Sequence, residues 1–341
     1  PNAVSSRPGR TDMTQQDQGL RPEEFGEAAE AAFTDALGRA EDTHAGVLAA
    51  AGLFGVCAPE EDGGMNLPLA FAVPVVQAAG KLRLRFALAE QIVLARHLPD
   101  GALRAALVDG SRRATIAAQG RLGEAWVGHA RQAQQSDWLL LRAPEGDGAQ
   151  LVDLSGAPRE LDPSLDPEEP AAWHDLSQAK VLAQLDAAAA AALWHDLELL
   201  FAASAHGAAD GALQAAVEHT GTRVQFGAPL STRQAVRHWL ARMKLLHEAS
   251  GAAIYHALRV DPAEPERAQP ARVARSALAL NLQHSAFIIE KAMHLHGGMG
   301  FTWELPLHRA LRGVRALDAA CGAGALARQL GQDFINAQEA A

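Results

Sequence analysis

The sequence predicts a mainly α-helical protein in which a small middle β domain separates an N-terminal helical domain from a C-terminal four-helix bundle. Ala and Leu, which favour helices, dominate much of the 341-residue chain, while aromatic residues make up only 5% of it. Short apolar segments separated by Gly, Asp and Pro are confined to the middle of the chain. Segments with helical spacing of apolar residues lie on either side. We expect boundaries at 1–20, 21–110, 111–180 and 181–341.

Charge and cysteine content exclude several classes of protein. The net charge is −10 and no basic run occurs, which argues against nucleic-acid binding. The only two cysteines, Cys57 and Cys321, are far apart, so we expect no disulfide framework and a reducing, cytoplasmic location. No apolar run approaches the roughly 20 residues of a membrane helix, and we expect no membrane insertion.

The N-terminal domain follows a segment, Pro1 to Leu20, that is rich in Ser, Gln, Gly and Asp and is predicted to be a disordered leader. Helical spacing then begins at about Pro22, with Phe33 and Phe54 among its apolar positions. A turn cluster at 59–64 interrupts it before a second helical run over 69–80. This pattern predicts several short helices.

The middle domain is predicted from strand and turn signals between about residues 110 and 178. Each apolar piece is three or four residues long and is bounded by Gly, Asp or Pro. Their number allows only a small sheet. The predicted strand segments are 115–117, 125–127, 138–141 and 150–152.

The C-terminal domain is predicted to be a bundle of four helices. The apolar face of the first helix, which includes Leu197, continues through small residues such as Gly207 that would let a neighbouring helix approach closely. The second helix begins near Ser231, the third runs from about Ala271 to Gly297, and the fourth follows Pro306, a favoured first-turn residue.

Three stretches carry a resemblance to a known family. The two specific ones are 222–234 (TRVQFGAPLSTRQ) and 294–312 (HLHGGMGFTWELPLHRALR). A less specific one is 49–65 (AAAGLFGVCAPEEDGGM). In order and spacing they resemble the acyl-CoA dehydrogenase family, over residues 25–335. The resemblance implies an acyl-CoA dehydrogenase-like fold and FAD-dependent α,β-dehydrogenation of an acyl-CoA thioester.

The resemblance also implies which residues contact FAD. In the family, the Arg-Phe-Gly segment of one subunit touches the FAD held mainly by another. Carried over, Arg223, Phe226 and Gln234 would contact the cofactor across a subunit interface, and Gly297 and Gly298 would line its pyrophosphate. A guanidinium has the planar fork that suits a phosphate, and glycines let main-chain N–H groups approach an anion.

Each of these residues also has a purely structural interpretation. Arg223 alone could be a solvated cation at a helix end, and Gly297-Gly298 alone could be a helix C-cap. Gln234 could belong to a capping box that starts at Ser231. A metal site at His294 and the histidine two residues later is not expected, because no carboxylate or cysteine nearby completes it.

The chain departs from the family at the catalytic base. Family members abstract the α-proton with a shielded glutamate that precedes a Gly-Thr pair. Counting from the matched glycines, this position falls on Cys321, followed by Gly322 and Ala323. In some branches the base lies on the helix that leads into Arg223. There the alignment places Leu197, one position before Glu198, which makes Glu198 a second candidate.

Three hypotheses remain. The middle domain lacks the family's flavin-contacting Ser/Thr segment, and the chain resembles the small, base-less subunit of two-component bacterial acyl-CoA dehydrogenases of lipid or steroid metabolism. The first hypothesis is a hetero-oligomer in which a second subunit supplies the base. The second is a self-sufficient homo-oligomer that uses Glu198. The third is a non-catalytic scaffold subunit with the same fold.

Overall fold

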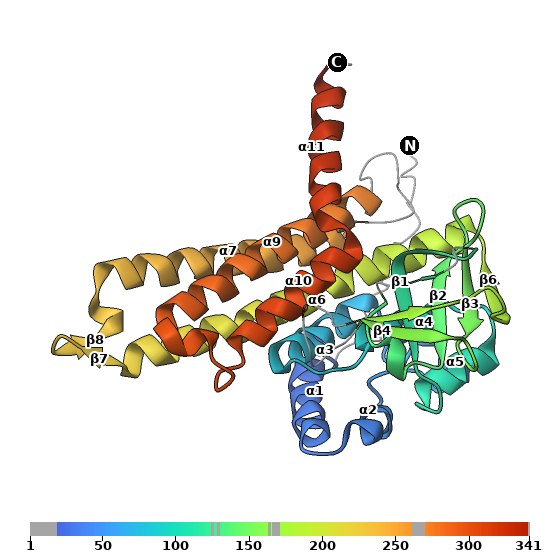
Figure 1. Cartoon of the computed structure of the whole chain (residues 1–341), viewed down its shortest axis with the longest axis horizontal. Coiled ribbons are helices and arrows are strands. Elements are labelled where there is room, and N and C mark those ends of the chain that lie inside the picture. The colour runs from blue at the N-terminus through green and yellow to red at the C-terminus, as the bar shows by residue number, and fades with distance from the viewer. Residues whose placement is uncertain are drawn as a thin grey trace, which may run out of the picture.

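The computed structural model describes residues 19–123, 126–127, 130–162, 165, 171–260 and 270–339. The predicted disordered leader lies outside the described residues except for its last two. The β domain and the N-terminal helices form one end of the molecule, and a long helical bundle extends away from them (Figure 1).

Five helices and two short 3₁₀ turns make up the N-terminal region. The first helix begins with Pro22 and carries Glu23 and Glu24 in its first turn, where negative charge is favourable. Asp100 caps the fifth helix by accepting hydrogen bonds from two backbone N–H groups. The elements are α1 (Pro22–Leu37), η1 (Glu41–Thr43), α2 (His44–Ala50), η2 (Glu60–Asp62), α3 (Leu69–Leu82), α4 (Leu88–His97) and α5 (Gly101–Val108).

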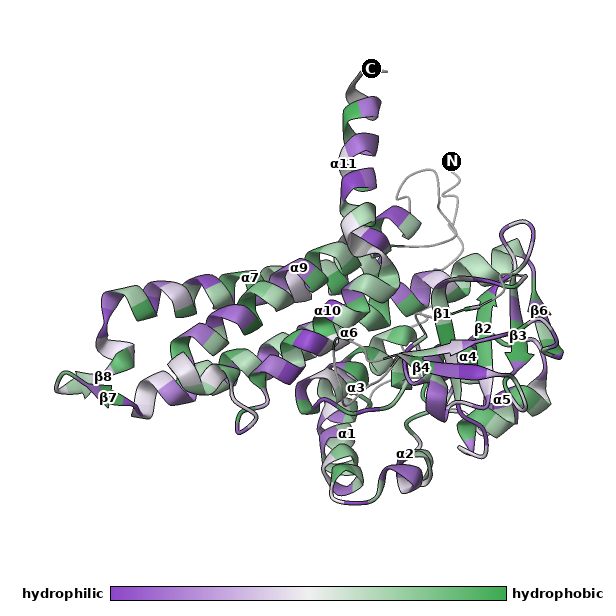
Figure 2. Ribbon diagram, in the orientation of Figure 1, coloured by the Kyte–Doolittle hydropathy of each residue, from purple (hydrophilic) through white to green (hydrophobic). Residues whose placement is uncertain are grey.

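The middle β domain is built on a four-stranded sheet in the order β1-β2-β3-β6. Strand β1 runs parallel to β2, and the other pairs are antiparallel. The first three strands are largely hydrophobic (Figure 2), in keeping with their burial. The strands are β1 (Ala114–Arg121), β2 (Trp138–Arg142), β3 (Ala149–Asp153), β6 (Val181–Leu185) and the separate pair β4 (Arg159–Asp162) and β5 (Ala171–His174), with η3 (Ala133–Gln135) between β1 and β2.

One predicted strand did not form. The segment 125–127 contributes only an isolated bridge from Val127 to His174, and its first residue lies outside the described part of the chain.

The C-terminal region confirms the predicted helical bundle. Helices α6, α7, α9 and α10 pack side by side, and α11 projects from the bundle (Figure 1). This last helix was not predicted. It is separate from α10 because Gly322 adopts φ +63, a left-handed conformation that ends a helix. The elements are α6 (Ala187–Thr222), β7 (Val224–Gln225), β8 (Ala228–Pro229), η4 (Leu230–Thr232), α7 (Gln234–Leu258), α9 (Pro270–His296), η5 (Gly297–Phe301), α10 (Leu307–Cys321) and α11 (Ala323–Glu339).

The capping box expected at Ser231 is wrong. Helix α7 begins at Gln234, and no side chain caps it. The hydroxyl of Thr232 instead donates to the carbonyl of Pro229, within the preceding 3₁₀ turn. The N-cap position is occupied by Arg233, so Ser231 lies two residues too early to cap the helix.

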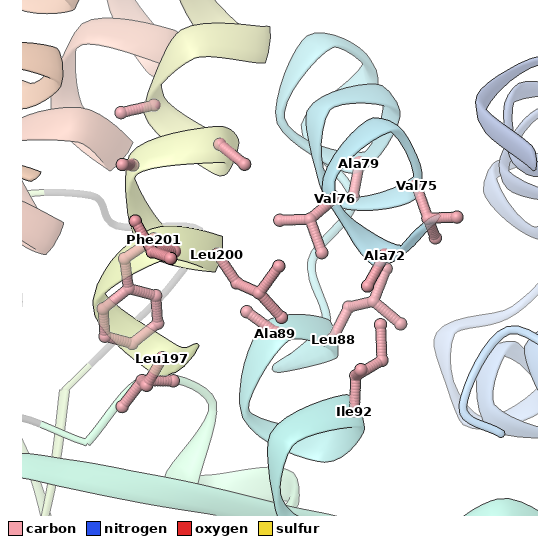
Figure 3. Packing of buried hydrophobic residues seen from close by; sticks show 14 of the residues in the cluster. Ala72, Val75, Val76, Ala79, Leu88, Ala89, Ile92, Leu197, Leu200 and Phe201 are labelled. Atoms are coloured by element: carbon pink, nitrogen blue, oxygen red, sulfur yellow. The ribbon is translucent and has the colours of Figure 1, made fainter. Parts of the chain in front are cut away.

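The small residues of α6 do admit a close neighbour, as predicted. A Cβ on Gly207 would overlap the backbone carbonyl oxygen of Gln77 in α3, and a Cβ on Gly80 would overlap that of Ser204. The two helices therefore touch backbone to backbone. Figure 3 shows the apolar core beside this contact, where Leu200 of α6 points toward Val76 of α3 and Leu88 of α4.

Candidate functional site

The far end of the bundle carries the first matched motif on a tight turn. Phe226 and Gly227 join β7 to β8, both with positive φ (54° and 79°). The turn leaves the Phe226 side chain 93% exposed. Arg233 fixes it by donating hydrogen bonds of 3.2 Å to the carbonyls of Gln225 and Phe226, with its guanidinium 5.7 Å from the Phe226 ring. The motif is thus presented in a defined conformation.

The second motif lies at this same end, which we call the bundle tip. The ring of His296, at the end of α9, stacks on the ring of His219, near the end of α6, with centroids 4.2 Å apart. Gly297 follows with φ +64, and a Cβ on Gly298 would meet nothing within 4 Å. Gly297 therefore does end a helix, as its structural interpretation proposed, and Gly298 presents open backbone to solvent.

The bundle tip has the charge and openness that a pyrophosphate would require. Arg223 is exposed, and its guanidinium forms no hydrogen bond or ion pair with any described residue. Partial burial lowers the pKa of His219, and the nearby His296 and Arg223 lower it further. Gln234 lies exposed in the first turn of α7. A cation without a partner beside open glycine backbone is a chemically suitable cradle for a diphosphate.

Apolar side chains surround this cradle. They lie in β7, in the turn after it and along the segment after α9, and they are among the most exposed hydrophobic residues described. A concentration of this kind is typical of a surface that is covered by another subunit. The residues, with their exposed fractions, are Val224 (53%), Met299 (49%), Phe301 (69%) and Trp303 (55%), in addition to Phe226.

The other end of the bundle contains a cavity of about 530 Å³, which we call the inner cavity. It is enclosed by α3, α4, α6, α10 and the loop before η3. Its walls are mostly apolar and rich in small side chains, and Arg131 and Gln132 of the loop also line it. Representative apolar wall residues are Val76, Leu88, Ala205, Val314, Leu317 and Ala320.

Cys321 ends α10 immediately after the wall residues Ala319 and Ala320. Burial raises the pKa of its thiol strongly; Arg131 opposes this, while Glu198 and Glu90 add to it. The thiol is therefore protonated at neutral pH and is a poor base.

Glu198 lies in α6, close enough to Cys321 to affect its pKa. Burial raises the pKa of Glu198 to about 7, against the opposing charge of Arg275, whose Nε lies 3.4 Å from the carboxylate. Neither Glu198 nor Cys321 is among the described residues that line the inner cavity. The structure therefore brings the two base candidates near one another, yet places neither of them on the cavity wall.

The two groups of predicted residues are far apart. Helix α6 has 36 residues and so spans about 54 Å, with Glu198 in its first third and Arg223 at its end. The flavin-contacting candidates Arg223, Phe226, Gln234, Gly297 and Gly298 are together at the tip, and Cys321 with Glu198 is at the inner end.

Three residues of the inner end were missed by sequence reasoning. Arg131 lies 3.9 Å from Glu90, whose carboxylate is fully buried in α4, and Gln132 follows Arg131 along the cavity wall. Glu90 lies within an apolar helical segment, where a buried acid is an anomaly that could have flagged it. The loop residues carry no such signal.

Two further findings concern metals and membranes. Among the residues that the structure describes, no group of three or more His, Cys, Asp or Glu side chains is arranged to hold a metal ion, the histidines at 294 and 296 included. None of the described helices is long and apolar enough to cross a membrane.

The fold and the tip motifs together define a class of protein. Residues 198–335 match the family described as "Acyl-CoA dehydrogenase, C-terminal domain". This match covers the C-terminal part of the chain, and the curated relatives of the chain are named acyl-CoA dehydrogenases, which are oxidoreductases.

Among curated proteins, the chain is similar to acyl-CoA dehydrogenase FadE34 of Mycobacterium tuberculosis, with 28% identity over 81% of this chain and 39% of that protein. The chain thus spans about two fifths of that relative. It is also similar to acyl-CoA dehydrogenase IpdE2 of the same organism, with 29% identity over 73% of each protein.

Solved structures share the fold. A variant of the Tcur3481–Tcur3483 steroid ACAD has a TM-score of 0.80 and 26% identity, covering 94% of this chain and 99% of that one. The ChsE4–ChsE5 complex of Mycobacterium tuberculosis has a TM-score of 0.79 and 19% identity, covering 92% and 97%. The latter likeness concerns the fold alone.

Proposed function

We propose that this chain is one subunit of an FAD-dependent acyl-CoA dehydrogenase and that a partner subunit supplies the catalytic base. The observation that supports this most is the separation of the two ends. The tip offers an open cradle for a diphosphate, whereas the inner end has a protonated thiol where the family has its glutamate. A flavin held at the tip would therefore serve a base that is not on this chain.

The tip residues have distinct roles in this proposal. Arg223 would meet the pyrophosphate, Gly297 and Gly298 would let it approach the backbone, and Phe226 and Gln234 would contact the rest of the dinucleotide. The bound FAD would supply the acceptor for the β-hydride of the acyl thioester. This chain contributes binding and orientation of the cofactor. The exposed apolar side chains of the tip exclude water once a second subunit covers them.

The partner and substrate are proposed from chemistry and from relatives. The exposed apolar side chains at the tip favour a covering surface, and two solved structures of similar fold are named as a Tcur3481–Tcur3483 steroid ACAD and as a ChsE4–ChsE5 complex. We propose an acyl-CoA thioester with a bulky acyl group, such as a steroid side-chain thioester. A cytoplasmic location rests on the two cysteines, both of which are free.

Co-expression with a base-bearing homologue tests the proposal. We expect the isolated chain to retain little FAD and to oxidise acyl-CoA thioesters slowly, and the mixed complex to retain flavin and turn over. Flavin would be counted by absorbance against protein concentration. Rapid reduction of flavin by an acyl-CoA in a homogeneous homo-oligomer of this chain would refute the partner hypothesis.

A self-sufficient homo-oligomer is the second candidate, and one observation favours it. The pKa of Glu198 is raised by burial to about 7, which suits a general base at neutral pH. Its test is Glu198→Gln in whichever assembly is active. The scaffold alternative has a simpler test, since a complex that remains colourless when saturated with FAD has no flavin site.

A further inference from the structure

The inner cavity contains a cation whose hydrogen-bond donors have no acceptor among the residues that the structure describes. Arg131 lines the cavity, and its side chain is 23% exposed. Its guanidinium donates no hydrogen bond to any described residue. Its nearest contacts are the carboxylate of Glu90, 3.9 Å from Nη1, and the ring of Phe201, 5.9 Å from the guanidinium carbon.

This arrangement leaves the donors of Arg131 available to a ligand in the cavity. A guanidinium has five N–H donors, and no Arg131 nitrogen is among the fully buried atoms without a partner, so water can reach these donors when the cavity holds no ligand. Glu90 balances the charge of Arg131, but at 3.9 Å it is too distant to accept a hydrogen bond. The Phe201 ring limits how the guanidinium can turn. Arg131 is thus charge-balanced and oriented while its donors remain unused.

The next residue, Gln132, also has a side-chain donor without an acceptor among the described residues. Gln132 is 7% exposed, lines the cavity, and has a side-chain Nε2 with no hydrogen-bond partner. Its backbone is held at φ +54, which is unusual for a residue with a side chain. Arg131 and Gln132 therefore both present side-chain donors without a described acceptor to the same part of the cavity wall.

Much of the remaining wall is suited to hydrocarbon, although Arg83, Arg309 and Arg85, which pairs with Glu41, also line the cavity. Walls formed by side chains such as Leu88, Val314 and Leu317 favour an apolar body, and small residues such as Ala205 and Ala320 leave width for a bulky one. A ligand that satisfies both parts must combine an apolar body with an acceptor that takes two donors.

We propose that the inner cavity binds an apolar carboxylate, with the carboxylate received by Arg131 in a bidentate pair and by the Gln132 amide. Glu90 acts as a positioning residue that holds Arg131 against the wall. The position of Cys321 agrees with this assignment. A cation near that position would stabilise a carboxylate anion and so weaken a catalytic base there, while it strengthens the binding of a ligand carboxylate.

The carboxylate has two possible sources. It belongs either to a free carboxylic acid or to the far end of a dicarboxylic acyl-CoA, and only the second rests on the function proposed above. Binding to the cavity is measured without turnover and without flavin, so its failure is distinguishable from failure of the dehydrogenase proposal.

The primary experiment is calorimetric titration of the full-length chain with octanoate and with 1-octanol, which share a hydrocarbon body. We expect octanoate to bind more tightly. Arg131→Gln should weaken octanoate about ten- to a hundredfold and leave 1-octanol unchanged, because a charge-assisted pair is lost. Gln132→Leu, which keeps the volume, should weaken octanoate about fivefold.

Controls keep the result interpretable. Arg315→Gln removes a cation that pairs with Glu290 on the outer side of α10 and should change neither affinity. Circular dichroism and melting temperature show whether each variant folds. If Arg131→Gln does not fold, the affinity of Gln132→Leu for octanoate tests the proposal instead.

Titration of the same variants with octanedioyl-CoA and octanoyl-CoA separates the sources. A loss confined to octanedioyl-CoA assigns the carboxylate to the acyl-CoA, and a loss confined to free octanoate assigns it to an acid. Equal affinities for octanoate and 1-octanol, an equal loss for both in Arg131→Gln, or no binding of either would overturn the proposal.

Discussion

The two ends of helix α6 differ in burial: several side chains at the tip are exposed, whereas those at the inner end are largely buried. Toward the inner end, the base candidates Glu198 and Cys321 are buried and cations oppose their raised pKa values, and near the middle of α6 the backbones of α3 and α6 touch at Gly80 and Gly207. At the tip, Arg223 has no partner among the described residues, Gly298 presents open backbone and Phe226 is exposed. The contact between α3 and α6 is thus completed by folding, whereas the tip leaves groups available for a ligand or a second subunit. Substitutions at that contact should therefore affect stability, and those at the tip should affect binding.

The largest effect is expected at Gly207. Gly207→Val should lower the free energy of unfolding by about 3 kcal/mol, since a side chain there overlaps a carbonyl of α3 and the helices must separate. Denaturant unfolding measures it. Gly221→Ala is the matched control on the same helix, because a Cβ there meets nothing within 4 Å. Gly221→Ala should leave the free energy of unfolding unchanged or raise it. Phe226→Ser at the tip should change it by less than about 0.5 kcal/mol. If Gly207→Val and Gly221→Ala lower the free energy of unfolding by similar amounts, the close contact at Gly207 is not what stabilises this part of the molecule.

The next effect concerns the buried carboxylate of Glu198. Burial raises its pKa from 4.5 to about 7, so the folded state holds a proton that the unfolded state releases between these values. Stability should therefore fall as pH rises from 4.5 to 7 and level off above, by about 2–3 kcal/mol in total. Glu198→Gln should lack this decline, which unfolding at pH 5 and pH 7.5 would measure. A parallel decline in both proteins would mean that Glu198 titrates normally.

At the tip, Arg223→Ala should weaken FAD binding to the assembled complex about ten- to a hundredfold, because a charge-assisted contact to a diphosphate is lost. The helical content should not change, since the side chain is exposed. Arg39→Ala removes an exposed arginine that pairs with Asp35 in α1 and should leave flavin affinity as it was. An unchanged dissociation constant in the Arg223 variant would remove this residue from the site.

The smallest effect is expected at Cys321. Burial raises the pKa of its thiol, so a thiolate is scarce at neutral pH, and Cys321→Ala should leave turnover of the complete complex within a few fold. Stopped-flow reduction of the flavin measures it. If turnover collapses while flavin content and assembly are preserved, the thiol of Cys321 is catalytic. The proposal that a partner subunit supplies the base is then wrong.

Sequence patterns anticipated what depends on local chemistry. Helical spacing and Pro22 located helices, and the small residues around Gly207 indicated a close helix contact. Gly297 was expected to end a helix, and it does. The motif at Arg223 indicated an exposed cation, since nothing adjacent in sequence could pair with it.

What the sequence did not reveal depends on distant packing. Arg131 has no pattern around it, and its significance comes from Glu90 and Phe201, which lie on other elements. The capping box at Ser231 failed because α7 begins only at Gln234, with Arg233 at the N-cap position. Helix α11 was missed because the left-handed Gly322 breaks a segment that is helical on both sides.

The contact between Gly80 and Gly207 has a mechanical consequence. Because no side chains separate α3 from α6 there, the joint has nothing to repack and cannot slide without breaking van der Waals contact. Beyond this contact, α6 extends to the tip, where the ring of His219 stacks on His296 of α9. A tilt of α6 by a few degrees at Gly207 would move Arg223 by an ångström or more, so the two glycines help to fix the position of a residue that they do not contact.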